Sequence, residues 1–144
     1  MEHSQWQSLL KSGNSCFHQQ LWQQAEFFYQ EAYDLLAHAY QGKPSCIDTM
    51  MAWICTCHNL SALYEKQDEI ELALRFLMLP HEYLKQLCST EQEDEDIKFV
   101  AIKGLNITAS PIFLFIKEHE ICQECQSRCA NLTSLTEVQT QTCH

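Results

Sequence analysis

The sequence contains little Gly and Pro, the residues that commonly form the turns between β-strands. Its 144 residues include only three Gly and three Pro. A sandwich or barrel of short strands needs a turn signal about every 8–12 residues, so this scarcity excludes an all-β fold. It also leaves no room for a phosphate-binding glycine loop or a G-x-S-x-G nucleophile elbow, and no H-E-x-x-H motif is present. We therefore expect a protein of few, long helices that is not an enzyme and carries no cofactor.

Positive charge is scarce as well. Nine Lys and Arg face nineteen Asp and Glu, for a formal charge of −10, and nucleic-acid binding depends on cations that neutralise phosphates. The longest apolar run, 109–116, contains Pro111 and ends at Lys117, and no basic segment precedes an apolar run near the first residue. Such a run is too short to span a bilayer. We expect a cytoplasmic protein with neither nucleic-acid nor membrane partners, its nine cysteines reduced.

Apolar residues recur at the i, i+3, i+4 spacing of helices through most of the chain. Ser-x-x-Gln, Ser-x-x-Asp and Thr-x-x-Glu patterns mark helix starts, and Ser110-Pro111 is read as the cap and first position of a last helix. Pro80 should kink or split the helix that contains it. We predict one domain over 1–135 and a frayed tail over 136–144. The expected helices cover 4–19, 21–40, 45–66, 70–88, 90–109 and 110–132, with turns near Gln20, 42–44, 67–68, 89–90 and 110–111.

The six expected helices form three antiparallel hairpins, and a small-residue pattern repeats between the first two. Gly13 precedes Ala25 by twelve residues, and Ser61 precedes Ala73 by the same distance. Small residues at these places allow the two helices of a hairpin to approach closely. We therefore expect Gly13 to contact Ala25 and Ser61 to contact Ala73.

The pattern around these positions resembles the tetratricopeptide repeat, W-x2-L-G-x2-Y followed by A-x3-F. The segment 59–67 is especially similar to the long-helix repeats of kinesin-light-chain type, and the period is 48 residues, from Gly13 to Ser61. A third unit aligned at 106–109 is degenerate, since Pro111 falls where Tyr is expected. The resemblance implies a short all-α solenoid that binds a partner peptide or protein in the groove of the first helix of each hairpin.

The same resemblance assigns the groove residues one by one. Asn recurs in all three units, and a side-chain amide can both donate to and accept from a peptide backbone. The equal alternative is that these Asn side chains are solvated or bond within the stack. The clamp for a terminal carboxylate is incomplete, since Leu10 stands where a Lys is expected. The groove residues so assigned are Gln7, Leu10, Asn14, Cys55, His58, Asn59, Ala62, Lys98, Ile102 and Asn106.

The cysteines suggest a rival function, a small metal-binding or redox protein, because Cys and His at short spacing can bind zinc or an iron–sulfur cluster. His119, Cys122, Cys125 and Cys129 have such spacing. On one straight helix, however, Cys122 and Cys129 are about 10 Å apart, too far to share one zinc ion. We expect core packing there and no metal.

Two further alternatives concern partners. Six aromatic residues surround more than one face of the second expected helix, so a homodimer could cover them. A small acidic helical chain is also compatible with a secretion-type chaperone or a structural protein. The aromatics are Trp22, Phe27, Phe28, Tyr29, Tyr33 and Tyr40.

Overall fold

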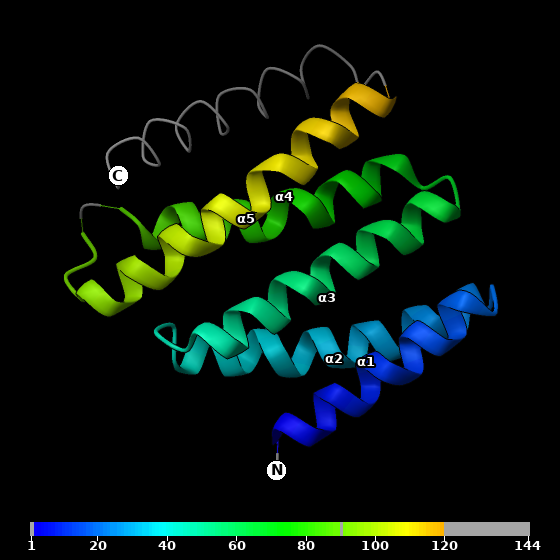
Figure 1. The fold of residues 1–144 in the computed structure, drawn as a ribbon, viewed down its shortest axis with the longest axis horizontal. Helices are drawn as coiled ribbons and strands as arrows, with labels where there is room; N and C mark the ends of the chain where they lie inside the picture. Colours follow the sequence, from blue (N-terminus) through cyan, green and yellow to red (C-terminus); the bar gives the residue numbers. More distant parts are fainter. Residues whose placement is uncertain (1, 90, 120–144) are drawn as a thin grey trace. The chain divides into compact units, whose positions relative to one another are not determined.

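The computed structural model describes residues 2–89 and 91–119, and the described chain is helical without any strand (Figure 1). Short connections join successive helices, as the scarcity of Gly and Pro predicts. The expected all-α class is confirmed. The helices are α1 (Glu2–His18), α2 (Trp22–Gly42), α3 (Ile47–Lys66), α4 (Ile70–Leu87) and α5 (Glu95–His119).

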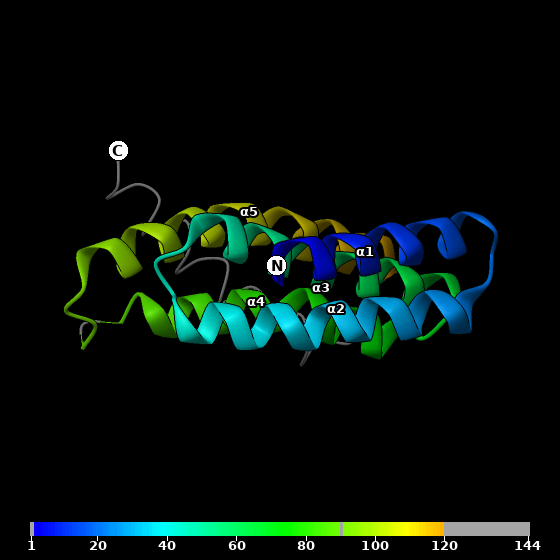
Figure 2. The same cartoon turned by 90° about the horizontal axis from the view of Figure 1, so that it is seen from below.

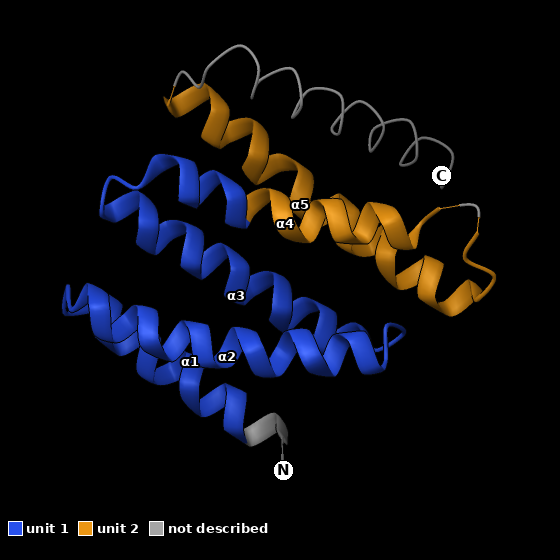
Figure 3. Ribbon diagram, turned by 180° about the vertical axis from the view of Figure 1, so that it is seen from behind, with its two compact units in different colours: residues 1–76 blue, residues 77–144 orange. Residues whose placement is uncertain are grey.

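Contacts divide the chain into two compact units, Met1–Phe76 and Leu77–His144, so that α4 contributes to both (Figure 3). The first unit contains α1, α2, α3 and the start of α4. The second contains the remainder of α4 and α5. The single domain over 1–135 stays a prediction, and the tail over 136–144 lies outside the described residues.

The first unit has two layers of helices. α1 and α3 both pack on α2, and within this unit they lie on one side while α2 forms the other (Figure 2). The crossing of α1 and α2 depends on Gly13, because a Cβ placed there would lie 2.5 Å from Cε1 of Tyr29. Tyr29 and Ala25 are buried on α2. Gly13 thus lets α1 approach the Tyr29 ring; its expected contact with Ala25 stays a prediction.

Polar side chains tie α3 to its neighbours inside this unit. Ser61 Oγ donates a 2.8 Å hydrogen bond to the carbonyl of Ala73, which confirms the expected contact. Tyr64 Oη donates to a carboxylate oxygen of Glu26 at 2.6 Å and accepts from Gln30 Nε2 at 3.1 Å. These bonds fix the register of α3 against α2 and α4, because each pairs polar atoms that packing removes from water.

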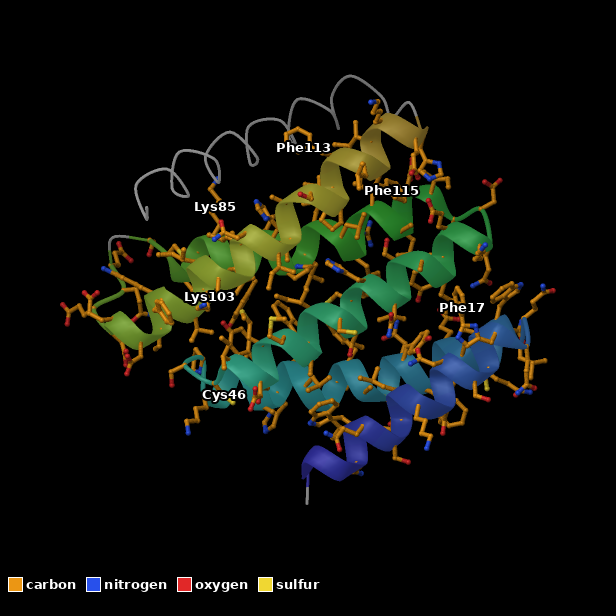
Figure 4. All side chains as sticks on the ribbon, viewed as in Figure 1. Phe17, Cys46, Lys85, Lys103, Phe113 and Phe115 are labelled. Carbon is orange, nitrogen blue, oxygen red and sulfur yellow. The ribbon has the colours of Figure 1, made fainter. Side chains whose placement is uncertain are left out.

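The turns of the first unit follow the expected places. Gln20 and Asp68 have φ of 62° and 60°, the left-handed conformation that reverses a chain after a helix. Phe17, labelled in Figure 4, packs edge-on against Trp22 with ring centroids 5.3 Å apart, which closes the first turn. The predicted turns at Gln20, 42–44 and 67–68 are therefore confirmed within a residue or two.

In the second unit α5 turns one stripe of side chains inward. Val100, Leu105, Ile112 and Phe115 are buried on it. The polar residue in this stripe is Thr108, whose Oγ1 lies 2.8 Å from Nδ1 of the fully buried His81 on α4. The Thr108 hydroxyl also donates a 3.0 Å hydrogen bond to the carbonyl of Gly104. The pair of Thr108 and His81 thus adds a polar contact to the packing of α4 and α5.

Two expected helix boundaries in this region are wrong. Ser110-Pro111 is not a turn, because α5 continues from Glu95 to His119 through Pro111. α5 also begins later than Thr90: Asp94 caps it, since its carboxylate accepts from the backbone N–H groups of Asp96 and Ile97 at 2.9 and 3.2 Å. A separate helix was expected over 110–132. Its residues up to His119 belong to α5 instead. Its remainder lies outside the described residues.

Other expected boundaries shift by a smaller amount. α1 begins at Glu2, before Ser4, and the cap of α3 is Cys46 instead of Ser45. Pro80 does not split α4, which runs from Ile70 to Leu87 around it. The described chain thus has five helices in place of six helices in three hairpins.

The continuous α5 also revises the expectation about apolar length. Because Pro111 does not end it, α5 is a 25-residue helix long and apolar enough to cross a membrane by composition alone. A core helix passes the same test, and α5 has the buried stripe of a core helix. Cytoplasmic localisation stays a prediction.

Candidate functional site

Two helices of the first unit present the residues that the sequence assigns to binding. Three of them lie on α1 and four on α3. The four on α3 begin at Cys55 and recur at i, i+3, i+4 and i+7, the spacing that places side chains on one helical face. We call this set the α1–α3 face. It consists of Gln7, Leu10, Asn14, Cys55, His58, Asn59 and Ala62.

The face is partly open to solvent. Gln7, Asn14 and Cys55 are exposed, whereas Leu10, His58, Asn59 and Ala62 are half-buried. None of the seven belongs to the fully buried core. Each of these residues therefore keeps some surface in contact with water, and the half-buried ones would lose that water if a partner covered them.

Tyr29 of α2 lies beneath the α1 part of the face. Its hydroxyl donates a 2.6 Å hydrogen bond to Asn14 Oδ1 on α1. Burial raises the Tyr29 pKa to about 12, with smaller contributions from the nearby thiols of Cys55 and Cys16. The phenol is therefore protonated at neutral pH, and it holds the Asn14 amide oxygen toward α2.

This bond bears on the two interpretations of the recurring Asn residues. Asn14 forms a hydrogen bond within the hairpin, which agrees with the alternative that these Asn side chains bond within the stack. Yet it is an exposed residue, and an amide with its oxygen engaged still offers two N–H donors. Tyr29 thereby orients a donor on the α1–α3 face.

His58 on α3 has one ring nitrogen that is not hydrogen-bonded to any described residue. Its Nε2 is buried and has no hydrogen-bond partner among the residues that the structure describes. Burial lowers the His58 pKa, because removal from water disfavours the imidazolium. The imidazole is consequently neutral at pH 7 and can accept or donate one hydrogen bond, but adds no charge to the face.

The cysteines of α3 are poor nucleophiles. Burial raises the pKa of the Cys55 thiol, and it raises that of the fully buried Cys57 thiol further. Both therefore remain thiols at neutral pH, and the thiolate is the reactive form. Cys57 is a core residue, as the sequence predicts.

The third set of expected groove residues lies on α5 in the second unit. Lys98 and Ile102 are half-buried and Asn106 is exposed, at the i, i+4, i+8 spacing of one helical face. The structure thus ties the first set to α2 through the bond between Tyr29 and Asn14, places the second set on α3, and describes the third by itself. Of the expected metal candidates, His119 ends α5, and Cys122, Cys125 and Cys129 lie outside the described residues.

Sequence reasoning missed one unusual thiol, Cys46, which is labelled in Figure 4. It occupies the position before the first residue of α3, and Thr49 Oγ1 donates a hydrogen bond to its Sγ at 3.1 Å. This bond and the backbone N–H groups of Thr49 and Asp48 lower the Cys46 pKa, since all of them stabilise the thiolate. The signal in the sequence was Thr three residues after the cap, and the choice of Ser45 as cap concealed it.

The aromatics of α2 separate into two groups. Tyr29 and Tyr40 are buried in the first unit, whereas the side chain of Phe27 is 59% exposed and meets Phe28 edge-on. Trp22 and Tyr33 are half-buried. The prediction that some of them remain exposed is thus confirmed at Phe27, and the homodimer stays a prediction.

Taken together, these helices define an all-α chain in which a surface of two helices is backed by a third. Residues 4–144 match the family described as "Protein of unknown function (DUF2753)", and the chain belongs to this family. Searches of curated proteins and of solved structures found no match to the chain. The tetratricopeptide resemblance therefore stays a prediction.

Proposed function

We propose that this chain is a protein-interaction module, of adaptor or co-chaperone type, that holds an extended segment of a partner protein on the α1–α3 face. The observation that carries the proposal is the bond from Tyr29 to Asn14. A buried phenol fixes the amide of an exposed residue, and a fixed donor loses less conformational entropy on binding than a mobile one. α3, which carries His58 and Asn59, packs on α2 as α1 does.

Amides suit an extended partner for a simple reason. Every residue of an extended peptide presents an N–H and a C=O group, and Asn or Gln can bond either of them. Asn14 and Gln7 on α1 and Asn59 on α3 supply such groups along two helices. Leu10 and Ala62 supply apolar contact between them.

The test is calorimetric titration of a partner peptide, captured with the wild-type chain, against Asn59→Ala and Tyr29→Phe. Asn59→Ala should weaken binding by about 1–3 kcal/mol with little change in the melting temperature. Tyr29→Phe should weaken it as well, because Asn14 loses the bond that orients it.

The matched control is Gln23→Ala, which truncates an exposed amide on α2. It should bind the peptide as the wild type does. Equal affinity in Asn59→Ala and wild type would refute the proposal and direct attention to Phe27 on α2, where a homodimer contact would then be sought by sedimentation.

A further inference from the structure

The outward side of α5 carries large apolar side chains. Phe99 is 59% exposed, Ile107 38% and Leu114 60%. They follow one another at intervals of eight and seven residues, which at about 3.6 residues per turn places them on one side of the helix, away from its buried stripe. Exposed apolar side chains that gather along one helix commonly mark a surface on which another protein packs.

The exposed residues on this side of α5 form a row whose spacing is the same from either end. Successive members are three, four, three, one, three, four and three residues apart. At about 100° of rotation per residue, all of them fall within about 100° of the helix circumference. We call this set the α5 row. It consists of Asp96, Phe99, Lys103, Asn106, Ile107, Ser110, Leu114 and Lys117.

Such a row is suited to pairing with itself. In an antiparallel pair of identical helices related by a two-fold axis, each residue in the first half of one helix faces the residue at the same distance from the centre in the second half of the other. The centre of the α5 row lies between Asn106 and Ile107. Every member of the row therefore has another member opposite it in a second copy.

The members that would face each other toward the ends of the pair are chemically complementary. Asp96 would lie opposite Lys117 of the second copy, so that an acid meets a base. Phe99 would lie opposite Leu114, so that two exposed apolar side chains lose their contact with water. Because the two-fold axis repeats each contact, one surface gains two charge pairs and two apolar contacts.

The charge of Lys103 does not oppose this pairing. Its Nζ lies 5.0 Å from the centroid of the Phe99 ring, so the cation is already held beside the aromatic member of the row. It would lie opposite Ser110, a neutral hydroxyl. The two copies of Lys103 would then be seven residue positions apart, which at about 1.5 Å per residue is about 10 Å.

The acidic residues at the two ends of α5 lie beside the row. Glu95 is four residues before Phe99, and Glu118 is four residues after Leu114. A step of four residues turns about 40° beyond one full turn, so Glu95 and Glu118 flank the row on opposite sides. In the two-fold pair they would therefore lie on opposite sides of the contact and not against each other.

We propose that the chain associates with a second copy of itself through the α5 row, as an antiparallel pair of α5 helices related by a two-fold axis. Asp96 of each copy pairs with Lys117 of the other, and Phe99 of each packs against Leu114 of the other. A parallel pair would place Asp96 against Asp96 and Lys117 against Lys117, so the charges select the antiparallel arrangement. This contact does not depend on peptide binding by the α1–α3 face.

Sedimentation equilibrium of the full chain tests the contact, in a reducing buffer that prevents disulfides between copies. The wild type should change from monomer to dimer as its concentration rises through the micromolar range, as expected of a small interface. Leu114→Gln should weaken the association by roughly tenfold or more, because each dimer loses two apolar contacts. Leu21→Gln is the matched control, since Leu21 is a 40% exposed leucine of the first unit, and it should associate as the wild type does.

Exchange of the charges tests the orientation. Asp96→Lys alone sets Lys against Lys at both ends of the pair, and Lys117→Glu alone sets Asp against Glu, so each should weaken the association by at least about fivefold. An equimolar mixture of these two variants should associate as the wild type does, because every Lys then faces an acid. Lys11→Glu on α1, with the same change of net charge as Lys117→Glu, should associate within about twofold of the wild type.

Three results would overturn the proposal. A wild type that stays monomeric over this range would assign the α5 row to another occupant, such as a lipid surface or residues 120–144 of the same chain. A dimer that Leu114→Gln leaves unchanged would place the contact elsewhere. A mixture that associates no better than either charge variant alone would exclude the antiparallel pair; these variants alter exposed residues only, so they decide the question even if Leu114→Gln unfolds.

Discussion

Substitution of Gly13 by Ala tests the packing that places α1 on α2. The new Cβ would lie 2.5 Å from Cε1 and 2.6 Å from Cδ1 of Tyr29, far inside the usual separation of about 3.5–4.0 Å between carbon atoms. The Tyr29 ring cannot simply swing away, because it is buried and bonded to Asn14. Overpacking of this kind costs about 1–3 kcal/mol, against about 1 kcal/mol gained from the better helix propensity of Ala. We expect a net loss of up to about 2 kcal/mol.

Gly42→Ala is the matched control for this substitution. Gly42 is also helical, as the last residue of α2, but a Cβ placed there would have no atom within 4 Å. It should be neutral or stabilising by up to about 1 kcal/mol. Urea unfolding of the two variants measures the difference. If Gly13→Ala were as stable as Gly42→Ala, Gly13 would not lie against Tyr29. If Gly13→Ala cost as much stability in a Tyr29→Leu background as in the wild type, the clash would involve another residue.

Three further changes have expected outcomes. Ser61→Ala removes the buried bond to the α4 carbonyl and should lower the free energy of unfolding by about 0.5–1.5 kcal/mol in urea titrations; no loss would contradict the close approach of α3 and α4 there. With iodoacetamide under native conditions, mass spectrometry should find Cys46 alkylated faster than Cys57, because the pKa of the first thiol is lowered and that of the second is raised; the reverse order would refute the hydrogen bond from Thr49 to Cys46. Tyr64 and Tyr29 have pKa values raised from 10.0 to about 12, so their contribution to stability is complete below pH 10 and is lost as the pH rises toward 12. Ultraviolet titration of tyrosinate should show both groups ionising only near that upper pH, and ionisation near pH 10 in the folded protein would contradict their burial.

The helix class and most turns of this fold follow from the sequence because they depend on local rules. Apolar spacing identified α1 to α4, and Gln20 and Asp68 lie in the turns where a helix must reverse. The repeated small residue at Ser61 correctly indicated a close approach to Ala73. These signals act over a few residues, so a sequence displays them directly.

The failure at Ser110-Pro111 has a tertiary cause. Locally the pair reads as a helix start, yet Ile112 and Phe115 continue the buried stripe of α5 beyond it. Pro111 has no N–H group to donate to the carbonyl of Ile107, so α5 lacks that one hydrogen bond. Burial of the stripe outweighs one lost hydrogen bond.

For the candidate site, the sequence could place residues on a helix face but not describe what lies beneath them. The spacing of His58 and Asn59 on α3 was readable, whereas the bond from Tyr29 to Asn14 joins residues fifteen positions apart on different helices. The burial of His58 Nε2 depends in the same way on packing. Such contacts arise from the tertiary structure alone.

The most direct test of the account is hydrogen exchange of the chain with and without a captured partner peptide. The α1–α3 face is held to be the binding surface, so peptide should slow exchange in α1 around Asn14 and in α3 around Asn59, while the outer side of α2 around Phe27 exchanges as before. Slowed exchange around Phe27, with α1 and α3 unchanged, would contradict it.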